Sequence, residues 1–104
     1  MLEIKDVFSE QVKLIENAWK DIIKKHPEVK DLKSEIAMTI SHPEVIVKSV
    51  YDERVTLCYR YFPDIFKGKL LVVVVKRLSQ QEKYVATVYI TDVRKGGEII
   101  WPRR

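Results

Sequence analysis

The segment Leu70-Leu-Val-Val-Val-Val-Lys-Arg-Leu78 determines the fold expected for this chain. It is apolar without interruption from its first residue through Val75, so a strand formed here would bury both of its faces. Strands of this kind are typical of the interior of a sheet, whereas a strand with one face in water alternates between apolar and polar residues. We therefore predict that this segment is a central strand.

The segments on either side of it, Arg54–Tyr61 and Tyr84–Thr91, alternate with the period of two that is typical of strands with two unlike faces. One face of the first segment is apolar and aromatic and is expected to point into the core; it carries Val55, Leu57, Tyr59 and Tyr61. The other face is expected to stay open to solvent; it carries Arg54, Thr56, Cys58 and Arg60. Shorter strands are expected at Glu44–Val50, at Ile99–Trp101 and at Leu2–Phe8, the last alternatively an extended lead-in.

The first half of the chain follows a helical period instead. Ser9 is a favourable helix N-cap, which predicts that the first helix begins there. The apolar stripe of this helix recurs every three or four residues and consists of Val12, Ile15, Trp19 and Ile22. The same spacing reaches His26, and Pro27 ends the helix.

A second helix is expected to begin with Pro27 at its first position, where proline is tolerated because its missing N–H would have no partner within the helix. Its apolar positions are Val29, Leu32, Ile36 and Ile40. The sequence Ser41-His42-Pro43 ends it, because proline disfavours helical geometry in the residue that precedes it.

Two helices followed by a run of strands with short connections predict an α+β fold. We expect a single domain that spans residues 1–104, because a chain of this length builds one core and not two. In this domain the two N-terminal helices pack on one face of a four- to five-stranded antiparallel sheet. The opposite face, with its threonine, tyrosine and arginine side chains, is a candidate platform for nucleic acid.

The charge of the chain is divided between its halves. Residues 1–53 carry eight lysines and no arginine against eleven acidic residues, for a net charge of −3. Residues 54–104 carry five lysines and six arginines against four acidic residues, for a net charge of +7. Because the arginine guanidinium matches the geometry of phosphate oxygens, this half indicates a polyanionic partner, with nucleic acid the first candidate.

The composition also indicates in which cellular compartment the protein is expected. The longest purely apolar run, Leu70–Val75, is far too short to cross a membrane, and the N-terminus lacks the basic start and apolar stretch of a signal peptide. Cys58 is the only cysteine, which excludes an intramolecular disulfide and favours a small, partly buried strand residue over a catalytic thiol. We expect a cytoplasmic protein without membrane association.

The four-residue sequence His-Pro-Glu-Val occurs twice, at His26–Val29 and at His42–Val45, and includes both histidines of the chain. Histidine titrates near neutral pH and is the usual proton carrier in catalysis. The proline after each histidine places both at helix boundaries, where a side chain can project into a cleft. Because His26 continues the apolar stripe, it is either a half-buried packing residue or a catalytic one, and His42 is expected in a surface turn.

Five segments follow one another in a recognisable order: Trp19–Glu28, Ser41–Ile46, Tyr59–Tyr61, Lys69–Lys76 and Val85–Tyr89. Their succession resembles the phage-associated barnase/EndoU/colicin/RelE-like (BECR-fold) nuclease families, which combine a helical histidine-proline-glutamate motif with a strand arginine, a "V-V-V-K" strand and a "T-A-Y" strand. The last motif reads Thr87-Val88-Tyr89 here, with Val88 expected to point into the core. His42 stands where these families commonly have asparagine or aspartate.

The resemblance implies a metal-independent endoribonuclease of toxin-like or phage-effector type, in which the ribose 2′-OH attacks the adjacent phosphate. It implies that His26 carries a proton. It also implies that Arg60 and Lys76 stabilise the transition state and that Thr87 orients the substrate. Five further residues are expected to contact RNA: Lys25, Tyr59, Arg77, Tyr89 and Arg94. No cofactor is expected, and no metal site, because two histidines and one cysteine match no recognised ligand spacing.

Two alternatives to cleavage stay open at this stage. The same fold could bind RNA or a ribosome without cutting it, or its basic half could dock an acidic protein such as an antitoxin or immunity protein. A steep salt dependence of RNA binding would argue against the second alternative.

Overall fold

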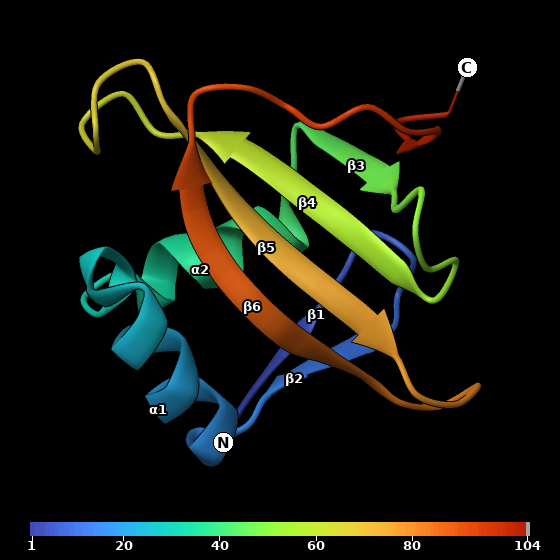
Figure 1. Ribbon diagram of the computed structural model, residues 1–104. Helices are drawn as coiled ribbons and strands as arrows, with labels where there is room; N and C mark the ends of the chain where they lie inside the picture. The colour runs from blue at the N-terminus through green and yellow to red at the C-terminus, as the bar shows by residue number, and fades with distance from the viewer. Residues whose placement is uncertain (104) are drawn as a thin grey trace.

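The computed structural model describes residues 1–103, and within them one α+β fold combines two α-helices and a 3₁₀ turn with an open, seven-stranded, mostly antiparallel sheet. The strand order in the sheet is β1-β2-β6-β5-β4-β3-β7. Figure 1 shows the helices beside and behind β6, on one side of a curled sheet. In chain order the elements are β1 (Leu2–Lys5), β2 (Gln11–Leu14), α1 (Glu16–Lys25), η1 (Pro27–Val29), α2 (Lys33–Ser41), β3 (Val45–Lys48), β4 (Val55–Tyr61), β5 (Leu70–Arg77), β6 (Lys83–Thr91) and β7 (Ile99–Trp101).

The strand β5 lies inside the sheet, as its sequence predicts. It pairs along its whole length with β4 on one side and with β6 on the other, and both pairings are antiparallel. Val72 and Val73 point to opposite faces, yet both are fully buried, because each face of the sheet carries an apolar cluster of its own. Val88 of β6 belongs to the cluster on the helix side, which confirms that it points into the core.

The sheet is larger than the four to five strands predicted, and it is not wholly antiparallel. β1 and β2 form a hairpin, and β2 extends the sheet by pairing in parallel with the first two residues of β6. At the opposite edge β7 pairs with β3. The prediction missed β2 because its apolar residues happen to continue the helical spacing of the residues that follow them.

The turn before β2 explains why the first helix does not begin at Ser9. Ser9 has a φ of 63°, a left-handed conformation, whereas a helix N-cap is extended. The carboxylate of Asp6 accepts hydrogen bonds of 2.9 Å from the N–H groups of Phe8 and Glu10, and this side-chain turn reverses the chain into the hairpin. The predicted N-cap is therefore wrong, because Ser9 belongs to a β-turn.

Helix α1 begins at Glu16, seven residues after the predicted start. Trp19 and Ile22 are buried on its inner face, as predicted, whereas Ile15 precedes the helix and is 41% exposed. Only the second half of the predicted apolar stripe is thus helical.

The second helix does not begin at Pro27. Pro27–Val29 forms one 3₁₀ turn, in which the N–H of Val29 donates to the carbonyl of His26 at 3.1 Å, and α2 begins at Lys33. The apolar positions predicted for this segment are nonetheless fully buried at Val29, Ile36 and Ile40. No helix within residues 1–103 is long and apolar enough to span a membrane.

The helices cover the face of β4 that was expected to stay open to solvent. Cys58 points to the helix side, where it joins the main apolar cluster. Leu57 and Tyr59 point to the other face, where they form a second cluster with Val72. The alternation was predicted correctly, and Leu57 and Tyr59 are buried as expected. The helices, however, cover the face that carries Cys58, because apolar residues line both faces of the strand.

Cys58 is a strand residue, as predicted, and at 4% exposed it is more deeply buried than the partly buried position expected. Burial raises the pKa of its thiol to about 12. A thiol in this environment stays protonated at neutral pH and is not a nucleophile.

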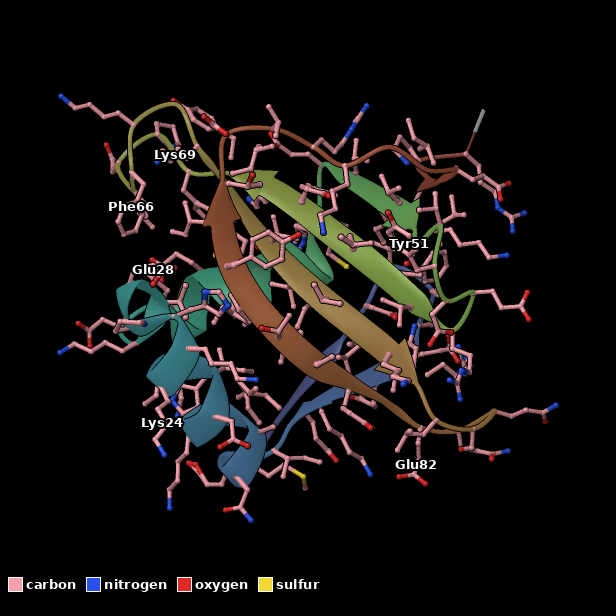
Figure 2. The ribbon with its side chains drawn as sticks, in the orientation of Figure 1. Lys24, Glu28, Tyr51, Phe66, Lys69 and Glu82 are labelled. Atoms are coloured by element: carbon pink, nitrogen blue, oxygen red, sulfur yellow. The ribbon has the colours of Figure 1, made fainter. Side chains whose placement is uncertain are left out.

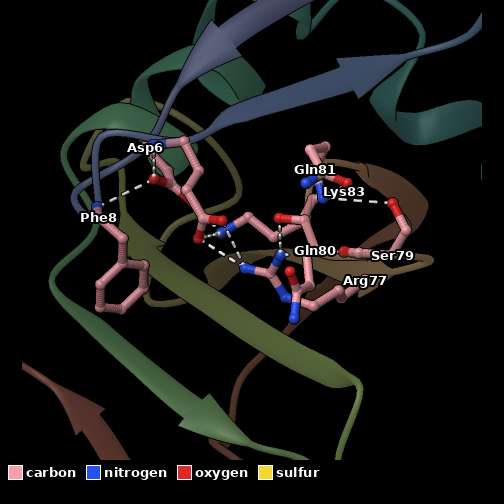
Figure 3. A network of polar contacts seen from close by, with 8 residues as sticks. Asp6, Phe8, Arg77, Ser79, Gln80, Gln81 and Lys83 are labelled. Carbon is pink, nitrogen blue, oxygen red and sulfur yellow. Dashed lines mark hydrogen bonds and ion pairs between the residues drawn. The ribbon is translucent and has the colours of Figure 1, made fainter.

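A partly buried ion network connects the hairpin to the end of β5 and the start of β6 (Figure 3). Lys83, only 10% exposed, pairs with the buried carboxylate of Asp6 and lies 3.1 Å from a carboxylate oxygen of Glu10. Arg77 donates two hydrogen bonds to the same Glu10 carboxylate, at 2.6 and 2.7 Å. Two basic and two acidic groups therefore compensate one another where the parallel strand joins the sheet.

Candidate functional site

His26 lies at the junction of α1 and the 3₁₀ turn, next to strand β6. Its N–H donates to the carbonyl of Ile22 at 2.7 Å and caps the helix, so that the side chain leaves the helix at a fixed angle. Its Nδ1 lies 3.5 Å from a carboxylate oxygen of Glu28, and its side chain is 33% exposed. A carboxylate beside Nδ1 favours the proton on that nitrogen and leaves Nε2 for proton transfer.

The imidazole faces the ring of Tyr89, with 6.1 Å between the ring centroids. Tyr89 is half-buried, and this burial raises the pKa of its hydroxyl. Within residues 1–103 the buried hydroxyl oxygen has no hydrogen-bond partner. An unpaired buried hydroxyl costs stability, so it is a group for which a ligand would supply a partner.

The segment that follows β6 brings a cation close to the same ring. The ammonium nitrogen of Lys95 lies 5.9 Å from the centroid of the Tyr89 ring. The backbone N–H of Lys95 donates to the hydroxyl of Tyr59 at 3.1 Å, which anchors the segment over β4. Burial raises the pKa of the Tyr59 hydroxyl, so it stays protonated there at neutral pH.

Gly97 holds the same segment close to β3. Its φ is +145°, and a Cβ at this position would lie 2.5 Å from the carbonyl oxygen of Lys48. The N–H of Lys48 in turn donates to the carbonyl of Glu98 at 2.8 Å. The segment therefore forms a rim whose position is set by backbone contacts.

Between this rim and the turn after β3 lies a groove of about 720 Å³ on the face of the sheet away from the helices. We call it the sheet-face groove; it is lined by Ser49, Val50, Tyr51, Val55, Leu57, Val74, Thr87, Tyr89, Lys95, Gly96 and Gly97. None of the described residues that line it is acidic. Figure 2 labels Tyr51 near β4 on one side of the view and Glu28, the neighbour of His26, across β6 on the other.

Of the four residues predicted to be catalytic, Thr87 is the one that lines the sheet-face groove within the described chain. Lys76 is on the same face of β5, because it follows Val74 by two residues and Val74 lines the groove. Its ammonium nitrogen lies 3.8 Å from a carboxylate oxygen of Asp52, so part of its charge is compensated.

Arg60 lies on the opposite face of the sheet. It alternates with Tyr59 and points to the helix side, where its guanidinium donates to the carbonyl of His42 at 2.6 Å. The guanidinium also lies 5.5 Å from the ring centroid of Phe62. Arg60 is thus hydrogen-bonded to the residue that follows α2, and its described contacts do not include His26. His42 is exposed after the last residue of α2, which confirms its place in a surface turn.

The residues expected to contact RNA are also divided. Tyr89 lines the groove and Tyr59 is buried beneath its rim, and Arg94 is exposed on the same segment as Lys95. Lys25 is exposed in the last turn of α1. Arg77 points away from the groove and is engaged by the carboxylate of Glu10.

Sequence reasoning missed three residues of this region: Glu28, Tyr51 and Lys95. Glu28 belongs to the same motif as His26, so its spacing was a usable signal. Lys95 precedes Gly96-Gly97, and adjacent glycines mark a close backbone approach, which was the second available signal. Tyr51 gave no signal beyond its place in a turn.

No group of three or more histidine, cysteine, aspartate or glutamate side chains within the described chain could hold a metal ion. Comparison with models of protein families, with curated proteins and with solved structures gives no match.

Proposed function

We propose that this protein is a metal-independent endoribonuclease that binds RNA along the sheet-face groove and cleaves it beside His26. The observation that carries the proposal is the contact between His26 and Tyr89, at one side of a groove that offers a lysine and no carboxylate. A proton carrier, an unpaired hydroxyl and a cation are thereby gathered around one ring.

These groups match what cleavage without a metal requires. The 2′-oxygen of ribose forms a bond to phosphorus while the bond from phosphorus to the 5′-oxygen breaks, and the products are a 2′,3′-cyclic phosphate and a 5′-hydroxyl. One proton leaves the 2′-oxygen and another reaches the departing 5′-oxygen, and His26 serves one of these transfers through Nε2. Lys95 stabilises the charge that develops on the phosphate oxygens, and the Tyr89 hydroxyl, which is buried in the free protein, adds a hydrogen bond where substrate binding uncovers it.

The proposal changes the roles of two residues expected to be catalytic. Arg60 braces the end of α2 through the carbonyl of His42 and takes no part in the reaction. Lys76 attracts the RNA backbone from the same face of the sheet but stays paired with Asp52. Thr87 keeps its proposed role and orients the substrate from the floor of the groove.

Replacing each histidine in turn tests the proposal. We expect wild type to cleave a mixed-sequence single-stranded RNA, and His26→Ala to reduce the rate by at least about 100-fold, since positioned proton transfer contributes that much or more. His42→Ala is the matched control, because it removes an exposed histidine from the second copy of the same motif, and it should cleave at the wild-type rate. Equal rates for His26→Ala and wild type would refute the assignment.

One observation favours a second candidate function, RNA binding without cleavage. Arg60 lies on the other face of the sheet and Lys76 is paired with a carboxylate, so the arginine and lysine implied for catalysis do not converge on His26. Wild type that binds RNA with a steep salt dependence, but cleaves no RNA, would support this second function and contradict the first.

A further inference from the structure

We infer that the sheet-face groove takes one unpaired nucleobase, which stacks on Tyr51 while the RNA backbone passes Lys95 and His26. This inference rests on the proposed function and assigns it a substrate class, single-stranded RNA. This role would account for the exposed position of Tyr51 in the turn after β3.

The exposure of Tyr51 is the first observation behind it. Its side chain is 92% exposed, and the adjacent Val50 is 67% exposed, although both line the groove. A bare tyrosine ring next to an apolar floor is poorly placed in water, and nucleic-acid-binding proteins use such rings as platforms for bases. The ring therefore suits a flat, aromatic ligand.

The chemistry of the lining is the second observation. The floor is apolar at Val55, Leu57 and Val74, which matches the face of a base, and hydroxyl groups are present for its edge. The rim provides Lys95, with Arg94 next to it in the chain, and no lining residue in the described chain is acidic. An apolar floor beside uncompensated positive charge favours a base with its phosphates over an apolar peptide.

The geometry of the rim is the third observation. The contacts of Gly97 with Lys48 and of Lys95 with Tyr59 hold the rim in place, so the groove exists before a ligand binds. A base in a duplex is stacked on both faces and paired along its edge. It is therefore unable to enter, and double-stranded RNA should bind weakly.

A strand that resists cleavage separates this inference from the proposed function. The probe is a short 2′-O-methyl RNA strand with a central 2-aminopurine, whose fluorescence falls when the base stacks. With wild type we expect the fluorescence to fall on binding, and we expect binding at least about tenfold tighter than for the matching duplex. Removing only the central base, with its sugar and phosphate retained, should weaken binding by roughly five- to 150-fold, the range expected for one stacked base.

Two pairs of variants test where the base lies. Tyr51→Ala should weaken binding by the same factor and restore the 2-aminopurine fluorescence, whereas Tyr61→Ala, which removes an exposed tyrosine outside the groove, should do neither. Val50→Asp adds a carboxylate to the groove, and Leu78→Asp adds one at an exposed apolar position outside both the groove and its rim. Only the first should weaken binding markedly.

Equal affinity for duplex and single strand, or unchanged binding by both Tyr51→Ala and Val50→Asp, would overturn the inference. Self-association of the protein that Tyr51→Ala abolishes, with no binding of the strand, would assign the groove to a second copy and overturn it as well. Because the probe is not cleavable, stacking on Tyr51 without any cleavage of ordinary RNA would uphold this inference and refute the nuclease. Cleavage of ordinary RNA by Tyr51→Ala at the wild-type rate would support the nuclease assignment and contradict the stacking of a base on Tyr51.

Discussion

The imidazole of His26 and the ring of Tyr89 lie 6.1 Å apart, with a tilt of 36° between their planes, although 62 residues separate them in the sequence. The contact joins the end of α1 to β6 and places a proton carrier beside an unpaired hydroxyl. The proposed chemistry depends on this pair.

Removing only the hydroxyl of Tyr89 should separate activity from stability. We expect Tyr89→Phe to lower kcat by roughly 10- to 150-fold, since a hydrogen bond to a charged group is worth about 1.5–3 kcal/mol. Its thermal unfolding temperature should stay the same or rise, because the lost hydroxyl has no partner within residues 1–103. A variant with normal kcat would show that the hydroxyl does not touch the substrate.

Tyr59→Phe is the matched control for that experiment. It removes the hydroxyl that accepts the Lys95 N–H, so it should destabilise the fold by about 1 kcal/mol in urea unfolding. Its effect on kcat should be the smaller of the two.

The partly buried ion network should be sensitive to the loss of one partner. Lys83→Met leaves the carboxylate of Asp6, which is 6% exposed, without its cation, and we expect it to cost about 3–5 kcal/mol in urea unfolding. Adding Asp6→Asn to Lys83→Met should recover part of this loss. A double variant no more stable than the single one would contradict the pairing, and Arg54→Ala, which breaks an exposed pair with Asp52, should have a much smaller effect.

The hydrogen bonds of the Glu10 carboxylate predict that the folded protein loses stability as the pH falls into the acid range. Hydrogen bonds from the Arg77 guanidinium hold the pKa of the Glu10 carboxyl below its usual value of 4.5 in the folded protein. The stabilisation from the ionised carboxylate is therefore present above pH 4.5 and is lost as the pH falls through the folded-state pKa. Urea midpoints between neutral and acid pH should fall less steeply for Glu10→Gln than for wild type, and parallel profiles would refute this role.

The rim should respond to a single methyl group. Gly97→Ala places a Cβ against the carbonyl oxygen of Lys48, at a φ of +145°, so we expect a loss of about 1–3 kcal/mol or a displaced rim with weaker RNA binding. Gly96→Ala meets nothing within 4 Å and should leave thermal unfolding unchanged. Equal stability and binding for the two variants would contradict the contact.

The strands at the centre of the sheet and those at its edges were predictable, whereas β2, which joins β1 to the rest of the sheet, was not. The unbroken apolar run in β5 and the alternation in β4 and β6 are local signals, and all three strands form where they were expected. The hairpin strand β2 was hidden because Val12 lies three residues before Ile15, a helical spacing that arises by chance. Its strand conformation follows from the turn at Asp6 and from pairing with β6, which is distant in the sequence.

The candidate site likewise combines a residue that a local signal predicts with residues whose positions depend on contacts between distant segments. The place of His26 at a helix boundary followed from Pro27, a neighbour in the chain. The role of Arg60 could not be read locally, because it depends on which face of β4 the helices cover, and both faces carry apolar residues. The position of Lys95 depends on a contact with Tyr59, 36 residues away, so only the adjacent glycines hinted at it.

The sugar requirement tests the nuclease assignment most directly. The substrate is a DNA strand with one ribonucleotide at its centre, prepared with each of the four bases, and mass spectrometry identifies the products. We expect wild type to cut at least one of these strands immediately 3′ of the ribose and to leave a 2′,3′-cyclic phosphate, whereas the all-DNA strand stays intact and His26→Ala cuts none. Cutting of the all-DNA strand, or no cutting of any ribose-containing strand, would contradict the account.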